Sequence, residues 1–489
     1  MMPAVLSTDV LIWLLVAAVA AYFRHVGKQP HLALPWRRVT QSASGMAALV
    51  LLLCFVFVGL LDSLHFRPRL EGRDPKAQSV YSSEVLSVFD VLATSLRSRP
   101  EKTYSAPLAT RAFAKELVEL PEGKQIRVFP RLRYGGAHLK DEADQGRDVF
   151  LTCLRALGLA LVAWAALSSL VVLIVSRLGA QGDTQGDTQG HGSAWSTVWR
   201  GETAVPWRTV LVTVGILAAL CFCTAALSAN YHVFGTDKVG QDVLYLALKS
   251  IRTGLVIGTL TTLVTLPLGV LLGIAAGYFR GWVDDVIQYV YTTLNSIPGV
   301  LLIAAAVLMM QVYVDTHPEL FPTSAQRADL RLLFLCIILG LTNWTGVARL
   351  LRGEALKLRE LEYIQAARAF GVGHMRIILR HILPNVMHLV LISLVMDFSG
   401  LVLAEAVLSY VGVGVDPSMT SFGTMINSAR LEMAREPMVW WALAAAFVFM
   451  FLMVLSANLF ADAVRDAFDP RVRTDFRPWR LRVPRQGRA

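Results

Sequence analysis

Two acidic residues, Asp397 and Glu405, lie inside one of the long apolar segments of the chain. An ionisable group is costly to bury in a membrane, and it usually faces a cavity or a partner. The two residues are eight positions apart, so a helix would carry both on similar sides. They could line a translocation path and contact the amino group of a transported molecule. Alternatively, they could pair with the backbone or with an arginine of a partner subunit.

The sequence lacks the motifs of several catalytic classes. It has no G-x-x-x-x-G-K-[ST] phosphate loop, so the chain cannot bind ATP in that way. It also has no H-E-x-x-H motif, no G-x-S-x-G motif and no Cys/His spacing suited to zinc. Its five cysteines lie in or beside apolar segments, where they are expected to act as small hydrophobic side chains. We therefore expect no enzyme activity, no metal site and no cofactor bound by this chain.

The composition is that of a membrane protein. Of the 489 residues, 55% are hydrophobic and 17% are charged, and the mean hydropathy is +0.52. Soluble domains have about 25% charged residues. The apolar content excludes a disordered chain, and the numbers of Gly and Cys exclude a collagen-like protein and a disulfide scaffold. We predict an all-α polytopic membrane protein.

Nine apolar runs approach the roughly 20 residues that a helix needs to cross a bilayer. The first run begins near Asp9 and could be read as a signal peptide, but no basic residue precedes it and no clear cleavage site follows it. We therefore expect it to be a retained helix. The predicted spans are 4–23, 45–64, 155–176, 209–229, 253–279, 283–313, 331–350, 385–410 and 438–463.

The distribution of Lys and Arg predicts the orientation. Residues 24–44, residues 349–384 and the C-terminal tail are strongly basic, whereas loops 314–330 and 411–437 are balanced or acidic. Basic loops face the cytoplasm. The C-terminus is therefore expected in the cytoplasm and the N-terminus outside. The net charge of +10 then reports orientation, and no nucleic-acid partner is expected.

Two polar insertions interrupt the spans. Residues 66–149 are expected outside the membrane as a small α/β cap, with helical stripes at 85–92 and 108–120. Alternating residues over 126–134 predict a strand, which Pro130 would confine to a sheet edge.

The second insertion lies in the cytoplasm and contains a repeated Gln-Gly-Asp-Thr sequence typical of a flexible linker. After it, Trp195, Trp199 and Trp207 could form an interfacial helix or simply anchor the next span. The predicted order is N-terminal membrane helices 1–65, insertion 66–149, a third membrane helix 150–176, linker 177–207, a six-helix transmembrane domain 208–465 and a basic tail 466–489.

The most specific pattern lies in the predicted cytoplasmic loop 351–384. It favours two short helices with a sharp turn between them at Gly371. Small residues such as Ala366, Ala367 and Ala369 would let another protein approach the first helix closely. Pro384 would open the next membrane helix, where its missing N–H costs little.

This loop resembles the Glu-Ala-Ala signature of permease subunits in ATP-binding-cassette (ABC) importers. In that family a Gly follows four positions later and a Leu-Pro pair thirteen positions further. Gln365 replaces the usual Glu, which weakens any role for an acid at this site. The matching residues are Ala366, Ala367, Gly371, Leu383 and Pro384.

A second motif, after the fourth span, resembles the Gly-Thr-Asp-x-x-Gly-Arg-Asp element of dipeptide and oligopeptide permeases of the second-subunit type. Here Gln241 replaces the Arg. The glycines permit tight turns, and the aspartates could cap the following helix. The matching residues are Gly235, Thr236, Asp237, Gly240 and Asp242.

The resemblance implies a six-helix permease core that carries di- or oligopeptides across a bacterial inner membrane, with three extra N-terminal membrane helices. It also implies a second permease subunit, two cytoplasmic ATPase subunits that hold ATP and Mg, and an extracytoplasmic peptide-binding protein. Two other classes remain as alternatives. An ion-gradient transporter predicts paired broken helices in inverted halves, which are not found here. A membrane scaffold or sensor would use the cap as its receptor.

Overall fold

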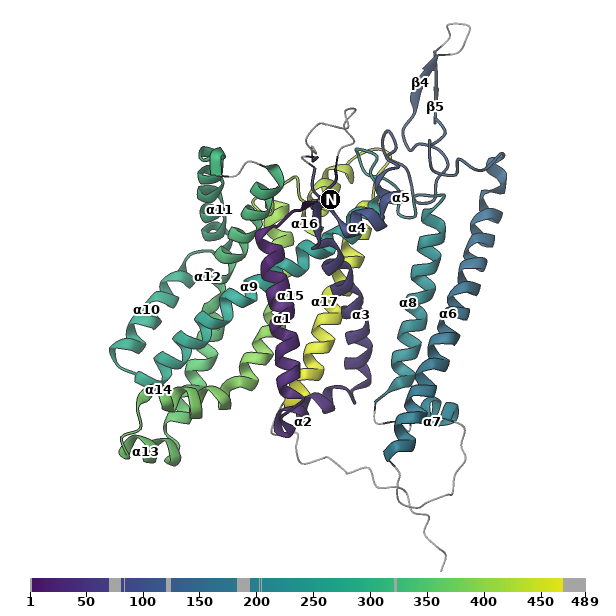
Figure 1. Ribbon diagram of the computed structural model, residues 1–489. Helices are drawn as coiled ribbons and strands as arrows, with labels where there is room; N and C mark the ends of the chain where they lie inside the picture. Colours follow the sequence, from purple (N-terminus) through teal and green to yellow (C-terminus); the bar gives the residue numbers. More distant parts are fainter. Residues whose placement is uncertain are drawn as a thin grey trace, which may run out of the picture.

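The computed structural model describes residues 2–69, 81–82, 84–119, 125–182, 194–201, 203, 205–320 and 323–468. Within these residues, nine helices are long and apolar enough to cross a membrane, and each overlaps one of the predicted runs (Figure 1). The polytopic all-α class is therefore confirmed. The predicted tail and most of the predicted linker repeat lie outside the described residues.

The first half of the chain supplies three N-terminal helices, an outer insertion and a long helical pair. Helices α1, α2 and α3 precede the insertion, and α6, α7 and α8 follow it. Their bounds are α1 (Ser7–Val26), α2 (Pro30–Val39), α3 (Ala43–Asp62), α6 (Gln145–Gly182), α7 (Ala194–Arg200) and α8 (Trp207–Ser228). Helix α6 continues into the residues predicted as flexible linker. Trp195 and Trp199 lie in a short helix, α7, whereas Trp207 begins α8.

The second half is built on two long helices, α9 and α12, that pack along much of their length. Glycines allow the close approach: a Cβ on Gly273 would lie 2.6 Å from the Ala348 carbonyl oxygen, and one on Gly277 would lie 2.6 Å from that of Arg352. The helices of this half are α9 (Val243–Phe279), α10 (Trp282–Ser296), α11 (Gly299–Thr316), α12 (Ser324–Arg359), α13 (Glu362–Ala369), α14 (His374–Ile377), α15 (Leu383–Val411), α16 (Phe422–Glu432) and α17 (Trp441–Phe468).

The predicted single span over 283–313 is wrong. The chain forms α10 and α11 there, separated at Ile297, which has an extended backbone (φ −91°, ψ 130°). Pro298 explains the break, because a proline disfavours helical geometry in the residue before it. Only α11 is long and apolar enough to count among the nine candidate spans.

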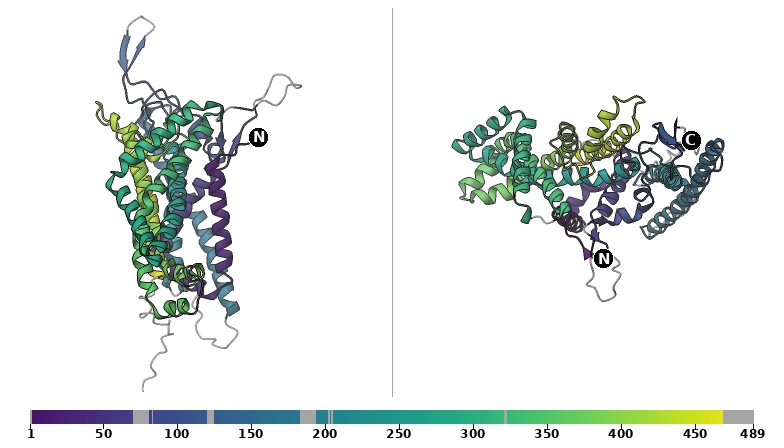
Figure 2. Two further views of the ribbon diagram at one scale, coloured as in Figure 1. Left: turned by 90° about the vertical axis from the view of Figure 1, so that its left-hand side faces the viewer. Right: turned by 90° about the horizontal axis from the view of Figure 1, so that it is seen from above.

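The two predicted groups of spans are interleaved in space. Helix α3 packs against α17 and α9, and α1 packs against α12 and α9. Helix α8, predicted as the first helix of the six-helix domain, packs instead against α6 and α3. Seen from above, α6 lies at one end of the elongated molecule and α10 lies at the other (Figure 2).

The outer insertion is an α/β unit, but one of its predicted helices is wrong. Residues 88–92 form α4 (Val88–Leu92), and α5 (Thr94–Arg97) follows. In place of the helix predicted at 108–120, β4 (Glu116–Glu119) pairs with β5 (Gln125–Val128) in an antiparallel hairpin. The backbone N–H of Ala112 donates to the Pro130 carbonyl (2.8 Å), so this segment bonds to a distant part of the same chain in place of forming helical bonds.

The predicted strand over 126–134 is shorter than expected. It ends at Val128, before Pro130, which has no N–H to donate to a neighbouring strand. A second, three-stranded sheet joins the N-terminus to the insertion through β1 (Met2–Pro3), β2 (His65–Arg67) and β3 (Leu86–Ser87).

Candidate functional site

The predicted coupling loop is a compact helical turn at one end of the molecule (Figure 1). Helix α12 runs to Arg359, well into the residues predicted as loop, and α13 follows as the first short helix. The second predicted short helix is not separate. Helix α14 continues through a π-helical turn, η3 (Ile378–Ile382), directly into α15. Any displacement of this turn would therefore be passed directly to a membrane helix.

Buried isoleucines fix the coupling loop to the transmembrane core. Ile364 of α13, Ile377 of α14 and Ile382 are all fully buried. They pack in one cluster with Leu351 and Ala355 of α12. Each buried aliphatic side chain contributes about 1.5–3 kcal/mol relative to its exposed state. The loop is therefore packed directly onto α12 and α15.

Gly371 forms the turn between α13 and α14 with a left-handed backbone (φ +74°). The N–H of Val372 donates to the Ala367 carbonyl (3.0 Å), which closes the end of α13. A Cβ at Gly371 would meet nothing within 4 Å. Glycine is required here by the backbone conformation and not by crowding.

The coupling loop exposes apolar and small side chains on the face that points away from the transmembrane helices. We call this the distal patch, and define it as Tyr363, Ala366, Ala369, Phe370 and Met375. Phe370 is 87% exposed and Met375 is 70% exposed, and both alanines are exposed as well. An apolar patch at a helical turn is typical of a surface that another protein covers.

Gln365 turns back toward the end of α12 and away from the distal patch. Its Nε2 donates to the carbonyl oxygen of Glu360 (3.2 Å), and the Glu360 carboxylate pairs with Arg280 (2.8 Å). Leu383 and Pro384 open α15 as predicted, with Pro384 in its first turn.

The second family motif, which is predicted on the outer side and is called the outer motif below, forms the loop between α8 and α9. Gly235 (φ +70°) and Gly240 (φ +78°) make the predicted turns. Asp242 caps α9 as predicted, because its Oδ1 accepts from the N–H groups of Leu244 (2.8 Å) and Tyr245 (3.4 Å). Asp237 does not cap this helix. Its Oδ1 accepts from the N–H groups of Val239 (2.9 Å) and Gln241 (2.8 Å), so it folds its own loop.

The outer motif is a socket for the insertion. The Thr236 N–H donates to the Ser105 carbonyl (3.1 Å), and the Glu101 N–H donates to the Gly240 carbonyl (2.9 Å). A Cβ at Gly240 would overlap the Glu101 carbonyl, and one at Gly235 would overlap that of Ser105. These glycines are needed both for their turns and for the close approach of the insertion.

A buried charge cluster strengthens this contact, and the sequence interpretation missed it. His232 Nδ1 lies 2.7 Å from Asp242 Oδ2, and its Nε2 lies 3.5 Å from Glu101 Oε1. Glu101 also accepts N–H bonds from Arg133 (2.9 Å) and Tyr134 (2.7 Å) of the insertion. The sequence signal that could have indicated the cluster is that His232 lies only ten residues before Asp242 of the motif. Glu101 could not have been found in this way, because it is more than 130 residues away in the chain.

The cluster shifts the ionisation of both partners. Burial opposes protonation of His232, but the two carboxylates outweigh it and raise its pKa to about 9. Burial likewise opposes ionisation of Glu101, but the contacts with His232 and the backbone N–H groups lower its pKa to about 2. Both groups are therefore charged at neutral pH, and the insertion is held to the motif partly by an ion pair.

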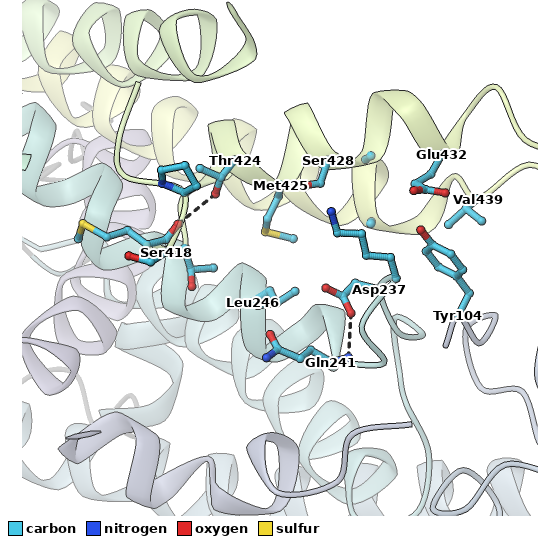
Figure 3. A pocket seen from close by; sticks show the side chains of 16 residues that line it. Tyr104, Asp237, Gln241, Leu246, Ser418, Thr424, Met425, Ser428, Glu432 and Val439 are labelled. Atoms are coloured by element: carbon cyan, nitrogen blue, oxygen red, sulfur yellow. Dashed lines mark hydrogen bonds between the residues drawn. The ribbon is translucent and has the colours of Figure 1, made fainter. Parts of the chain in front are cut away.

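A pocket of about 210 Å³ lies between the insertion, the motif loop and α16 (Figure 3). Asp237 and Gln241 line one side, and Ser428 and Glu432 of α16 line the other. The insertion contributes Tyr104, whose hydroxyl points toward Glu432 in Figure 3. Burial of Asp237 raises the pKa of its carboxyl. The insertion thus forms one wall of a pocket that is lined by both polar and apolar side chains.

The two intramembrane acids have different surroundings. Glu405 is 1% exposed, and it accepts hydrogen bonds from Ser409 Oγ (2.6 Å) and Ser421 Oγ (2.8 Å). Because Ser421 caps α16, Glu405 ties α15 to α16 and is not accessible to a substrate in this conformation. Asp397 is half-buried, and its Oδ2 has no hydrogen-bond partner in the described part of the chain. Lining of a path by these residues stays a prediction.

A second buried cluster, also missed from the sequence, holds α1 to the core. Arg252 of α9 pairs with Asp9 of α1 (2.5 Å), and the Thr8 N–H and hydroxyl both donate to Asp329 of α12. His65 also contacts Asp9 (2.7 Å). At the opposite end, Asp284 makes a bidentate pair with Arg352 (2.6 and 2.7 Å).

Comparison with known proteins decides the family. Residues 269–474 match the family described as "Binding-protein-dependent transport system inner membrane component". The chain is 31% identical over 243 residues to the oligopeptide transport system permease protein OppC of Mycobacterium tuberculosis. The aligned segment covers 50% of this chain and 77% of that protein. The chain belongs to this family of ABC importer permeases.

Other permeases of the family also match half of the chain. The glutathione transport system permease protein GsiD of Pectobacterium atrosepticum is 32% identical, with 50% of this chain and 75% of that protein covered. The dipeptide transport system permease protein DppC of Bacillus subtilis is 28% identical, with 50% and 69% covered. A solved structure of the MetNI methionine ABC transporter is 20% identical and covers 45% of this chain and 94% of that chain, with a TM-score of 0.33.

The permease assignment excludes the alternatives of a gradient-driven transporter and a scaffold. In this family ATP hydrolysis is carried by separate subunits, and the chain functions together with other ABC transporter subunits. The motif residues of the coupling loop all lie within the matched segment, whereas the insertion and α1–α8 precede it.

Proposed function

We propose that this permease forms half of a translocation path for peptides, with a second permease subunit forming the other half. The observation that carries this proposal is that the coupling loop is exposed on one face and packed on membrane helices on the other. Its apolar distal patch is exposed, yet buried isoleucines join the same loop to α12 and α15. The named substrates of its relatives, oligopeptides, dipeptides and glutathione, support a peptide cargo.

The distal patch is the proposed contact for two cytoplasmic ATPase subunits, one on each permease. These subunits would bind ATP and Mg, and this chain would bind neither. Closure of the ATPase pair would push on α13, and the continuous helix from α14 to α15 would pass that displacement into the membrane. The chain then acts as path and lever and carries out no catalysis.

In this proposal the permease lies in a bacterial inner membrane, with its coupling loop and its C-terminus on the cytoplasmic side. The insertion lies at the opposite end of the molecule from the coupling loop (Figure 1), and its Tyr104 lines the pocket described above. A peptide-binding protein outside the membrane would deliver its cargo to that end. Asp397 is the acid of the pair that remains open to a role along the path.

The proposal is tested by Phe370→Asp, which places a charge at the centre of the distal patch. We expect loss of the ATPase subunits on co-purification and loss of peptide-stimulated ATP hydrolysis, with the thermal stability of the permease unchanged. Val239→Asp is the matched control, since Val239 is also exposed (60%) but lies on the outer motif loop. Retention of the ATPase subunits by the Phe370 variant would refute the coupling surface.

A further inference from the structure

A cavity with an almost wholly apolar lining lies inside the membrane-spanning part of the molecule. It has a volume of about 510 Å³ and lies between α1, α3, α9, α15 and α17. Leu15 and Val19 of α1 form one wall, and Val56 of α3 and Phe398 of α15 form others. The cavity therefore separates the N-terminal helices from the helix that follows the coupling loop.

The cavity exists because α1 is fixed at its two ends and stands away from the core between them. At the outer end, Asp9 pairs with Arg252 (2.5 Å). At the other end, Trp36 of α2 packs edge-to-face on Phe23 (ring centroids 5.0 Å apart) and on Phe468 of α17 (5.5 Å). Leu15 and Val19 lie between these two attachments and line the cavity.

The lining offers nothing to a polar ligand. Among the described lining residues, the polar side chains are Thr259 and Thr262. Thr259 Oγ1 donates to the Leu255 carbonyl (2.6 Å), and Thr262 Oγ1 donates to the Gly258 carbonyl (2.6 Å). Both hydroxyl protons are already used within α9, so the lining offers a polar ligand no free donor.

We propose that this cavity binds an acyl chain of a membrane phospholipid with an anionic headgroup. An apolar cavity of roughly 150 Å³ is large enough to take up benzene, so this one can hold a much longer hydrocarbon segment. In a bilayer, the molecules available to fill an apolar space beside the spans are lipids. An empty space of this size would instead forfeit the dispersion contacts of every lining side chain.

Charge near one end of the cavity selects the headgroup. Exposed basic residues lie where α1 ends and α2 begins and ends, namely Arg24, Lys28 and Arg37. This end lies on the same side of the molecule as the coupling loop (Figure 1). Basic segments beside a membrane helix attract anionic headgroups. An acyl chain running past Val19 would bring its phosphate toward these side chains.

The experiment compares Val56→Trp with Leu53→Trp, the same substitution one turn away on α3. Leu53 is 55% exposed and does not line the cavity, so it is the matched control. Each full-length protein is purified in detergent, and its bound phospholipid is counted by native mass spectrometry. We expect wild type and Leu53→Trp to retain a phospholipid, and Val56→Trp to retain at least about tenfold less, equivalent to about 1.4 kcal/mol of lost affinity.

A second variant covers the case in which Val56→Trp fails to fold. Val19→Trp fills the same space from α1, and it must lower lipid retention in the same way. Equal retention by a folded filling variant and by Leu53→Trp would overturn the proposal, and so would a wild-type protein that retains no phospholipid.

The headgroup is tested separately in vesicles that contain equal phosphatidylglycerol and phosphatidylcholine. We expect wild type to retain mainly phosphatidylglycerol, and the double variant Arg24→Gln/Arg37→Gln to lose that preference. Arg200→Gln, on the exposed surface of α7, is the control for the removal of a basic residue elsewhere. An unchanged preference in the double variant would refute the anionic headgroup.

Discussion

The outer motif loop and the coupling loop use the same backbone device in opposite surroundings. Each contains a glycine with a left-handed backbone, Gly240 in the outer loop and Gly371 in the coupling loop. At Gly240 the insertion approaches so closely that a Cβ has no room, whereas at Gly371 a Cβ would meet nothing within 4 Å. A family motif can therefore be an internal socket or an exposed contact surface, and only its surroundings distinguish the two.

The largest expected effect separates these two glycines. Gly240→Ala adds strain from the positive φ and an overlap with the Glu101 carbonyl, so we expect a loss of stability of about 3 kcal/mol or more. Gly371→Ala adds the backbone strain alone, about 1–2 kcal/mol. Thermal unfolding of both purified variants checks the order.

Among variants that still fold, we expect the larger loss of peptide uptake from a change at Gly371. Gly371→Val should abolish peptide uptake while the chain still inserts into the membrane, because the turn that aligns α13 with α14 is distorted. Gly373→Val is the matched control, since Gly373 has an ordinary helix-capping backbone (φ −60°) and open space around it. Normal uptake by Gly371→Val, or equal stability of Gly240→Ala and Gly371→Ala, would contradict the comparison.

The next effect distinguishes the two intramembrane acids. Glu405→Ala removes the one oxygen, Oε1, that accepts from both Ser409 and Ser421, and it leaves these buried hydroxyls without that acceptor, so we expect a loss of about 1–3 kcal/mol. Asp397→Asn should leave stability unchanged or raise it, because it removes a charge whose Oδ2 is unpartnered. Thermal unfolding measures both, and a larger loss for Asp397→Asn would show that the described contacts do not determine stability here.

The sequence was sufficient where a local pattern determines the structure. Apolar run length located eight of the nine candidate spans of the described residues and missed the break at Pro298, and the motif spacing located the Gly371 turn and the Asp242 cap. It failed where partners are distant in the chain. Glu101 and His232 meet only because the insertion folds back on the motif, and Asp9 meets Arg252 across more than 240 residues. The helix predicted at 108–120 failed for a related reason, since residues 116–119 pair with 125–128 and the Ala112 N–H donates to Pro130, which replaces helical bonds within the segment.

A smaller effect depends on pH and concerns only the outer loop. The folded pKa of His232 is about 9 against an ordinary 6.5, so its stabilisation is complete below pH 6.5 and is lost as pH rises through 9. The pKa of Glu101 is about 2 against 4.5, so its contribution is complete above pH 4.5 and is lost as pH falls toward 2. We expect the midpoint temperature of thermal unfolding to decrease as the pH is raised from 7 to 9.5.

His232→Gln should remove most of that decline. Its unfolding temperature should be lower than wild type at pH 6.5 and close to it at pH 9.5, because at high pH the wild-type histidine is also neutral. Parallel curves for the two proteins over this range would mean that His232 does not carry the pH dependence.

The smallest effect concerns the departure from the family signature at Gln365. Gln365→Glu restores the common acid, but it removes the hydrogen bond to the Glu360 carbonyl and places a second carboxylate beside that of Glu360. A like-charge contact on a helix surface costs about 0.2–0.5 kcal/mol. We expect ATP hydrolysis by the assembled transporter to change less than about twofold, since that cost corresponds to a factor of about two. Gln365→Ala removes the same hydrogen bond without adding charge. If the Glu variant is weaker than the Ala variant and its defect disappears in high salt, repulsion from Glu360 is the cause. If the Glu variant is much more active than wild type, an ATPase subunit recognises an acid at this position. Gln365 would then weaken the contact between the coupling loop and the ATPase subunit.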